Sequence, residues 1–281
     1  MMVVGLLATF FLGVTQLAQV EPSETPVAKK KEQIRVVPVT RTPESENSTV
    51  FIALPKPGEI ITDQPVWVQF RTQQYSLGAD SGQFERASQV AVTNMGQTVH
   101  VVIDNEPYFP VNEPAIDPFN ELGNFRLTYY KFKIPYLLKD GPHTLRMFLA
   151  RSFGESLKGF NTFQALNFQI GNKDASGKKM GGVDLFEPYL TYNEPSDQIP
   201  LTANKPLLLD FFLSNCELSA DGYRVQLSID GQVARVLTSW QPYYIYGLKK
   251  GTHTIRLELL DSHNTLVPGP FNDVERKILV Q

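Results

Sequence analysis

An internal repeat is the feature that most constrains how this 281-residue chain can fold. Residues 136–149 match residues 246–259 at a constant offset of 110, with eight identical positions. Two upstream pairs of segments match at offsets of 126 and 141: 99–105 with 225–231, and 65–70 with 206–211. The offsets differ because the first copy is longer between these segments, as expected when core strands keep their length and insertions fall in loops. The repeat predicts one folding unit that is present twice.

The repeated segments have the period of β-strands. Apolar residues alternate with polar ones over 223–230, 255–259 and 166–170, which is the pattern of strands with one buried face. Turn residues such as Asp-Gly and Pro-Gly separate these segments at a spacing of about 8–12 residues. Outside the first twenty residues, no run of ten or more keeps the helical period of 3.6. The pattern predicts antiparallel β-sandwiches.

The stretch Leu-Lys-x-Gly-x-His-Thr-x-Arg occurs at 138–146 and at 248–256 and leads into a late strand of each copy. It resembles the penultimate-strand region of bacterial immunoglobulin-like and fibronectin type III-like modules. The resemblance implies an all-β chain of two tandem antiparallel β-sandwich (Ig-like) modules after an N-terminal leader and linker. The cysteine pair and core Trp of antibody domains are absent here, and Cys216 is the single cysteine. Such sandwiches serve as adhesins, carbohydrate binders and spacers, so the resemblance implies a fold and leaves the function open.

Composition sets the predicted domain boundaries. Residues 1–20 carry no charged side chain and contain an apolar run that is shorter than a membrane span of about 20 residues, as in a signal peptide or a short hydrophobic anchor. The Pro, Glu and Lys residues of 21–48 predict a disordered linker. The rest divides into a first module at 49–171, an interdomain linker at 172–183 and a second module at 184–281.

The N-terminal segment leads us to expect an exported protein that is secreted, periplasmic or held in the cell envelope. Two features depart from a typical signal peptide: no basic residue precedes the apolar run, and Gln16 stands at position −3 for cleavage after Ala18. Lys29, Lys30 and Lys31 follow the run, and positive charge prefers the cytoplasmic side. The alternative is therefore a short reverse anchor that leaves the chain on the cytoplasmic face of a membrane. In both cases the membrane is contacted only through this segment, if it is uncleaved.

Charge and motifs exclude several classes of function. The chain has 26 basic and 29 acidic residues, and no basic block, so we expect no nucleic-acid partner. One cysteine excludes an intrachain disulfide and a Cys-based metal site. The Gly-x-Ser-x-Gly motif of hydrolases and the phosphate-binding glycine loop are both absent from the sequence. We therefore predict a non-enzymatic protein without catalytic residues, cofactor or metal.

His143 and His253 occupy equivalent places in the repeat, each after an equivalent aspartate, Asp104 or Asp230. An Asp–His pair can transfer protons or bind metal. A fold requirement, however, is copied with the fold, whereas a catalytic site need not be, so the duplication favours histidines that bind backbone in a loop. A metal site that adds His263 is disfavoured, because ten residues of straight strand separate it from His253 by about 30 Å.

The first copy contains an insertion, residues 105–128, that is rich in proline, aromatic and acidic residues. Such a loop can present a fairly rigid surface to a protein or glycan partner, or it can pack its own rings against the sandwich. The candidate binding residues are Tyr108, Phe109 and Phe119 in this insertion and Trp240, Tyr243 and Tyr244 in the second copy. The sequence thus predicts an envelope-associated binding or spacer protein that recognises another macromolecule. The alternative is a carbohydrate-binding accessory protein, or a secreted hydrolase whose site the sequence does not reveal.

Overall fold

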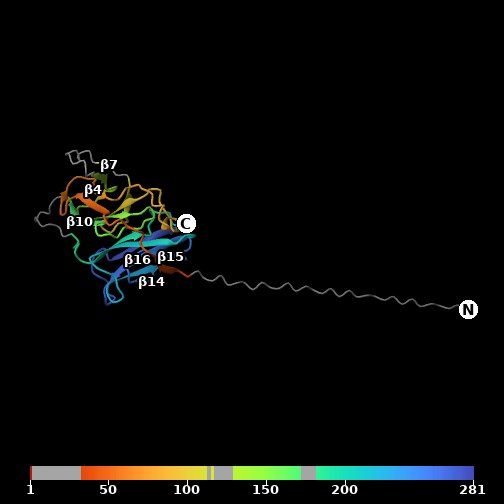
Figure 1. The fold of residues 1–281 in the computed structure, drawn as a ribbon. Helices are drawn as coiled ribbons and strands as arrows, with labels where there is room; N and C mark the ends of the chain where they lie inside the picture. Colours follow the sequence, from red (N-terminus) through yellow and green to blue (C-terminus); the bar gives the residue numbers. More distant parts are fainter. Residues whose placement is uncertain (2–32, 113–114, 117–128, 172–181) are drawn as a thin grey trace. The chain divides into compact units, whose positions relative to one another are not determined.

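The structure is a computed structural model that describes residues 1, 33–112, 115–116, 129–171 and 182–281. Residues 2–20 of the predicted leader, residues 21–32 of the predicted linker and residues 172–181 of the predicted interdomain linker lie outside the described residues. All that follows concerns the compact unit Gln33–Gln281. Its secondary structure is β, apart from the four-residue helix α1 (Arg86–Gln89) (Figure 1). In the described part of the chain, no helix is long and apolar enough to cross a membrane.

Two sheets form the first half of this unit. One sheet has the order β2-β4-β8-β7, with strands Thr49–Leu54, Trp67–Gln73, Tyr130–Lys133 and Ala115–Ile116. The other has the order β3-β10-β9-β5-β6, with strands Ile60–Ile61, Phe163–Ile170, Gly141–Ala150, Thr98–Ile103 and Phe109–Val111. Every pairing is antiparallel except that of β3 with β10.

The second half repeats this arrangement. One sheet has the order β1-β15-β12-β11, with strands Arg35–Pro38, Tyr243–Tyr246, Leu207–Ser214 and Tyr189–Glu194. The other has the order β14-β13-β16-β17, with strands Gln232–Leu237, Arg224–Ile229, Gly251–Leu260 and Asp273–Val280. All of these pairings are antiparallel.

The strand order confirms the predicted immunoglobulin-like fold. Lettered in chain order, β2, β4, β8 and β7 of the first half are strands A, B, E and D, and β5, β9 and β10 are strands C, F and G. An A-B-E-D sheet that faces a C-F-G sheet is the immunoglobulin arrangement. In the second half, β11, β12 and β15 correspond to A, B and E, and β13, β16 and β17 to C, F and G. That the two halves fold as separate modules stays a prediction.

Each half has its own hydrophobic core between its two sheets. The first core takes Val68 and Phe70 from one sheet and Val101 and Leu145 from the other. The second core includes the apolar residues of the predicted alternating segments: Val225, Leu227, Ile229, Ile255, Leu257 and Leu259. The alternation therefore identified the buried face of these strands correctly.

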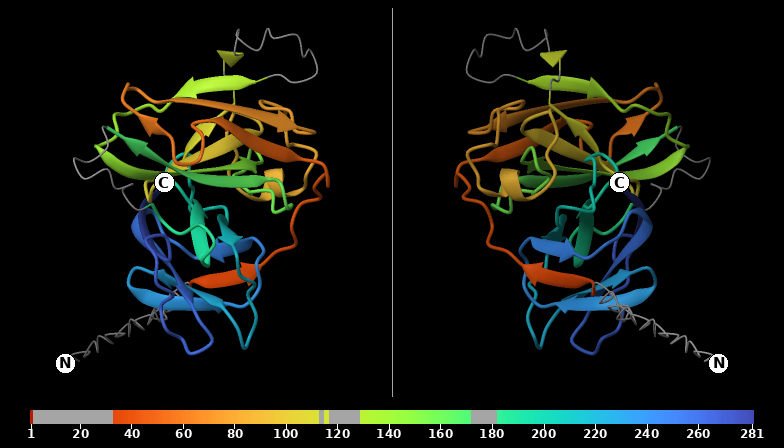
Figure 2. Two further views of the ribbon diagram at one scale, coloured as in Figure 1. Left: turned by 90° about the vertical axis from the view of Figure 1, so that its left-hand side faces the viewer. Right: turned by 90° about the vertical axis from the view of Figure 1, so that its right-hand side faces the viewer.

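Strand β1 corrects the prediction of a disordered linker, which is wrong for residues 33–48. Val36 pairs with Ile245 of β15 and is buried in the second core. In Figure 2, this orange strand lies among the blue strands of the second half. It takes the place next to strand E that β7 takes in the first half. The polar and proline-rich composition of residues 21–48 gave no sign of a strand. The strand partner of β1 is β15, which lies about 200 residues further along the chain, so no local pattern marks the pairing.

The two halves also share buried side chains. One mixed cluster joins Val90 and Phe153 of the first half to Leu208 and Tyr244 of the second. A further cluster joins Val102, Tyr108 and Phe148 to Phe212. These contacts, together with β1, connect the halves within one compact unit.

Candidate functional site

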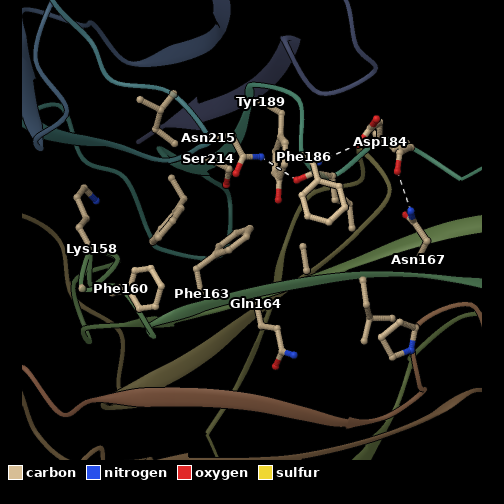
Figure 3. A pocket seen from close by; sticks show the side chains of 18 of the residues that line it. Lys158, Phe160, Phe163, Gln164, Asn167, Asp184, Phe186, Tyr189, Ser214 and Asn215 are labelled. Atoms are coloured by element: carbon tan, nitrogen blue, oxygen red, sulfur yellow. Dashed lines mark hydrogen bonds between the residues drawn. The ribbon is translucent and has the colours of Figure 1, made fainter.

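A groove of about 980 Å³ lies where the two halves meet (Figure 3). One wall comes from the turn before β10 and from β10 itself, and the other comes from β12 and the residues that precede β11. Six aromatic residues line it: Phe160, Phe163, Tyr189, Phe186, Phe212 and Trp240. Ligand sites in proteins are typically concave and lined by aromatic side chains with a few polar groups.

Three of these rings form a packed floor. Phe163 at the start of β10 stacks on Phe212 of β12, with ring centroids 4.3 Å apart and planes at 17°. The edge of Trp240 meets Phe212 at 4.9 Å and 75°. The indole nitrogen Nε1 of Trp240 donates to the backbone oxygen of Phe211 at 3.0 Å, which fixes the ring. The floor is therefore rigid and contains residues of both halves.

The two remaining phenylalanines stand at the rim. Phe160 is 97% exposed and Phe186 is 92% exposed, and in Figure 3 Phe163 lies between them. The turn that carries Phe186 is held by Asp184, whose Oδ1 accepts the backbone N–H of Phe186 at 2.9 Å. Full burial of a phenylalanine is worth about 1.5–3 kcal/mol. A ligand that covers both rings would gain this burial.

Amide side chains brace the rim. Asn167 Nδ2 donates to the backbone oxygen of Val183 at 2.7 Å. Asn215 Nδ2 donates to the backbone oxygens of Leu185 at 2.7 Å and Glu187 at 2.8 Å. Both contacts hold the segment on either side of Phe186. Within the described part of the chain, Asp184 supplies the only carboxylate that lines the groove.

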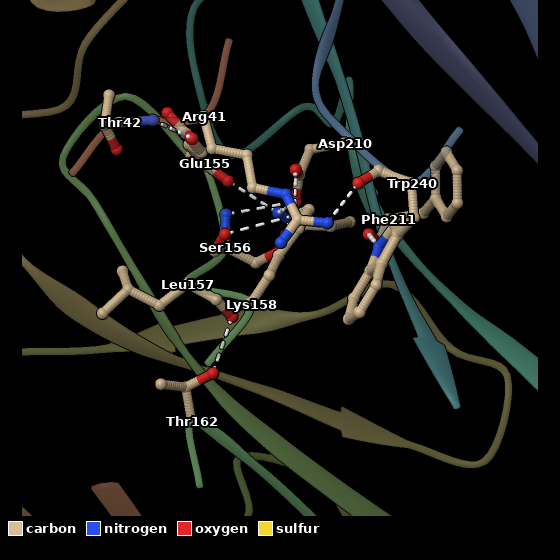
Figure 4. Close-up of polar contacts among 12 residues, drawn as sticks. Arg41, Thr42, Glu155, Ser156, Leu157, Lys158, Thr162, Asp210, Phe211 and Trp240 are labelled. Carbon is tan, nitrogen blue, oxygen red and sulfur yellow. Dashed lines mark hydrogen bonds and ion pairs between the residues drawn. The ribbon is translucent and has the colours of Figure 1, made fainter. Parts of the chain in front are cut away.

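A buried polar cluster lies beside the groove (Figure 4). Lys158 Nζ lies 2.7 Å from Ser156 Oγ and 2.6 Å from Asp210 Oδ1. Ser156 Oγ in turn donates to Asp210 Oδ2 at 2.5 Å. A serine beside a lysine can act as a nucleophile beside its base. Here the side chains of Lys158 and Asp210 have no exposed surface and compensate each other's charge, so this arrangement offers no approach for a substrate.

His143 and His253 lie in matching hydrogen-bonded turns. His143 Nδ1 lies 2.7 Å from Asp104 Oδ2, and its Nε2 lies 2.7 Å from the backbone oxygen of Lys139. In the second copy, the distances from His253 to Asp230 and to the backbone oxygen of Lys249 are both 2.8 Å. Both aspartates have a positive φ, 52° and 50°, a conformation that Asp tolerates better than most residues.

The acceptors on both ring nitrogens favour the charged imidazolium. The hydrogen bond that His143 donates to Asp104 raises the pKa of His143 against the opposing effect of burial. For His253, burial lowers the pKa, but the bonds to Asp230 and the Lys249 carbonyl outweigh it and raise the pKa overall. The second oxygen of each aspartate accepts the next backbone N–H, from Thr144 or Thr254. The histidines thus connect the turn that follows strand C, β5 or β13, to the start of strand F, β9 or β16.

Three predicted binding residues are buried, so the prediction that they contact a partner does not fit. The Tyr108 hydroxyl donates to Glu194 Oε1 at 2.5 Å, and its ring stacks on His100 at 3.8 Å between centroids. Tyr243 lies in the second core. The Tyr244 hydroxyl donates to Gln89 at 2.6 Å. All three side chains are at most 5% exposed, so they offer a ligand little surface.

The other three predicted binding residues lie in different environments or outside the described residues. Phe109 is half-buried and packs edge-on against Phe132 at 5.8 Å. Phe119 lies outside the described residues. Of the predicted residues that the structure describes, only Trp240 lines the groove. In the part of the 105–128 insertion that the structure describes, the rings pack inward, as in the alternative interpretation of this loop.

Phe160 and Phe186 were missed because no periodic pattern marks them. Phe160 follows Gly159 in a turn, and Phe186 lies between acidic residues shortly before Pro188. A lone phenylalanine among turn residues is the signal that could have identified each one, since turns on the surface rarely need a large apolar side chain.

The described residues provide neither a metal site nor a reactive cysteine. Among the described residues, no group of three or more His, Cys, Asp or Glu side chains could hold a metal ion. Cys216 is partly buried beside the second core, and burial raises the pKa of its thiol to about 11. The thiol is therefore protonated at neutral pH and a poor nucleophile.

Comparison with known proteins finds no matching family model and no matching curated protein. Solved structures that are similar include the fibronectin(III)-like modules of Clostridium thermocellum CbhA, with 14% identity, a TM-score of 0.27 and coverage of 83% of this chain and 94% of that chain. Latent PorU from Porphyromonas gingivalis shares 12% identity, with a TM-score of 0.24 and coverage of 92% and 21%. The glucan-utilisation protein SGBP-B of Bacteroides ovatus, solved with a mixed-linkage heptasaccharide, shares 12%, with a TM-score of 0.21 and coverage of 84% and 48%.

A titin Z1Z2 tandem shares 8% identity at a TM-score of 0.19 and covers 83% of this chain and 99% of that chain. Identities and TM-scores this low carry no argument about activity or ligand. The assignment to the immunoglobulin-like style of fold rests on the strand order of the two halves.

Proposed function

We propose that this protein is a non-enzymatic, exported carbohydrate-binding protein whose groove takes a neutral oligosaccharide. The observation that carries the proposal is the pair of exposed rings, Phe160 and Phe186, above an aromatic floor. The C–H faces of sugar rings pack against the electron-rich faces of aromatic rings. Two rim rings that are exposed on most sides offer such faces.

The charge of the groove supports a neutral ligand. Among the described residues that line the groove, Asp184 is the only carboxylate, and the Lys158 ammonium is buried and paired with Asp210. A charged sugar that enters the groove loses its hydration and finds no buried partner of opposite charge there, which makes its binding unfavourable. Hydroxyl groups of a neutral sugar can hydrogen-bond to the amide and carboxylate side chains of Gln164, Asp184 and Asn215.

An apolar protein segment is the competing occupant. Anchors in protein interfaces usually fill well-packed recesses, whereas Phe160 and Phe186 project outward and leave their ring faces accessible. The projecting rings therefore favour a stacked sugar over an inserted side chain.

Calorimetric titration with a panel of neutral oligosaccharides tests this proposal. The fluorescence of Trp240, measured in a Trp67→Phe variant because the chain has two tryptophans, is a second readout in the groove. We expect Phe160→Ala and Phe186→Ala each to weaken binding by about tenfold or more, because each removes one stacking surface. Leu137→Ala is the control, since Leu137 is an exposed apolar residue that does not line the groove.

The outcomes separate the candidates. Binding with unchanged sugar chains after incubation, checked by chromatography, fits a non-enzymatic protein, and shortened chains would identify a hydrolase. If no oligosaccharide binds but an apolar peptide changes the fluorescence of Trp240, the groove is a protein-binding site. If both alanine variants only lower the melting temperature, the rings serve packing within the protein.

Export is tested separately. Full-length protein expressed in its source cells is expected in the secreted or envelope fraction, as the apolar run of residues 1–20 suggests. Recovery in the cytoplasmic fraction would reject export and leave the groove proposal untouched.

A further inference from the structure

A second surface of the first half combines exposed rings with positive charge. It is the outward face of strands β2, β4 and β8, on the side opposite the core residues Val68 and Phe70. Cross-strand register places Phe51 opposite Arg71 and Trp67 opposite Lys133. We call these four residues the ring–cation face.

Each cation on this face lies over a ring. Arg71 Cζ is 4.9 Å from the Phe51 ring centroid, and Lys133 Nζ is 4.8 Å from that of Trp67. About half of the Trp67 surface and 40% of the Phe51 surface remain exposed. The cations are thus held beside rings that are still accessible, and a ligand can contact both at once.

The face is positive in a protein of net charge −3. Strands β2, β4 and β8 contain three basic residues and no acidic residue. Within the described part of the chain, neither Arg71 nor Lys133 forms an ion pair with a carboxylate. Charge complementarity therefore points to an anionic ligand.

We infer that the ring–cation face binds an anionic polysaccharide. Its rings take the C–H faces of the sugars, and Arg71 and Lys133 pair with carboxylate or sulfate groups. Trp67 and Arg71 are four residues apart on one strand, which separates the two ring–cation pairs by about 13 Å. This span favours a polymer over a single sugar.

Two features favour a polysaccharide over a nucleic acid. Nucleic-acid sites neutralise several phosphates with clustered Lys and Arg, while this face has few cations and the chain is acidic overall. The two ring–cation pairs also lie about 13 Å apart along the sheet, so their rings do not form a platform of neighbouring aromatics on which successive bases could stack.

Affinity electrophoresis at low salt tests the inference with polygalacturonate and dextran sulfate as probes and uncharged dextran as the control polymer. We expect retardation by at least one anionic polymer, whereas any retardation by dextran should come from the groove and be lost in Phe160→Ala/Phe186→Ala. Trp67→Ala and the double variant Arg71→Gln/Lys133→Gln should each weaken binding by about tenfold, and added salt should weaken the wild type more than the double variant. All four positions are at the surface, and circular dichroism confirms that the variants fold.

The groove provides the matched control. Phe160→Ala/Phe186→Ala should bind the anionic polymers as the wild type does, so the failure of the groove proposal is distinguishable from the failure of this one. Absence of binding to both anionic polymers, or binding that the Arg71→Gln/Lys133→Gln variant retains in full, overturns the inference. Equal retardation by single-stranded DNA, lost in the same variant, would show a general polyanion site and also overturn it.

Discussion

Lys158 Nζ lies 2.6 Å from Asp210 Oδ1, and neither side chain has any exposed surface. Lys158 lies between β9 and β10 in the first half, and Asp210 lies on β12 in the second. Asn193 Nδ2 and Ser156 Oγ also donate to Asp210 Oδ2, at 2.7 Å and 2.5 Å. The ion pair is therefore fully hydrogen-bonded and fixes how the two halves meet.

Breaking this pair from one side should be costly. We expect Lys158→Met or Asp210→Asn to lower the free energy of unfolding by about 3–5 kcal/mol, because each leaves one buried charge without its partner. The double variant should lose less than the sum of the two. Urea denaturation measures all three. The control is Arg256→Gln, which removes the exposed ion pair with Asp273 and should cost at most about 1 kcal/mol; an equal cost for Lys158→Met would contradict the buried-pair account.

Strand β1 should stabilise the second half through one buried valine. Val36→Asp places a charge in the second core and should lower the free energy of unfolding by more than about 3 kcal/mol. Amide hydrogen exchange in β15 should accelerate, because β1 covers that strand. Val37→Asp is the control at a partly exposed neighbour. Unchanged exchange in β15 after Val36→Asp would show that β1 does not hold the sheet edge.

The repeated histidines should make stability fall in mildly alkaline solution. Their pKa values are raised above 6.5, so their contribution is complete below pH 6.5 and is lost as the pH rises through the raised values. The pKa of Asp230 is lowered, since its hydrogen bonds from His253 and Thr254 outweigh burial, so its contribution is lost as the pH falls from 3.8. NMR titration of the two imidazoles measures the shifts directly. Values at or below 6.5 would contradict the turn geometry, and His143→Gln/His253→Gln should remove the alkaline loss.

Glu194 predicts a second pH dependence. Burial raises its pKa to about 8, although hydrogen bonds from Tyr108 and Ser196 oppose the shift. A carboxyl with a raised pKa contributes its full share below 4.5, and stability declines as the pH rises from there toward 8. Melting temperatures over this range should fall in the wild type and stay flatter in Glu194→Gln. Parallel curves for the two proteins would mean that Glu194 is already ionised in the folded state.

Local pattern predicted the strands and the buried face of the second core. The alternation over Val225, Leu227 and Ile229 required no knowledge of distant residues, because a strand's own period decides which side faces inward. The duplicated His143 and His253 turns were also foreseeable, since each is built from one aspartate and one strand entry. Repetition at a fixed offset supplied information that one copy alone would not give.

Contacts between residues that are far apart in the chain could not be predicted from the sequence. Tyr108 resembles a loop aromatic until Glu194, far along the chain, accepts its hydroxyl hydrogen. The ion pair of Lys158 with Asp210 joins two segments with no shared pattern. Phe160 and Phe186 form a candidate site because the turns before β10 and before β11 lie at the same groove. Each of these depends on how two distant surfaces meet, which no periodicity encodes.

The position of β1 has a consequence for the order in which the protein can be completed. A ribosome or an export channel releases residues 35–38 long before Tyr243–Tyr246 emerge, so the earliest ordered strand waits for about 200 residues to be made. Such distant pairing slows folding, and in the interval the waiting strand can dock on β15 of another chain. The finished β1–β15 contact is therefore a marker that synthesis has passed Tyr246, and a chain truncated before β15 would keep β1 unpaired.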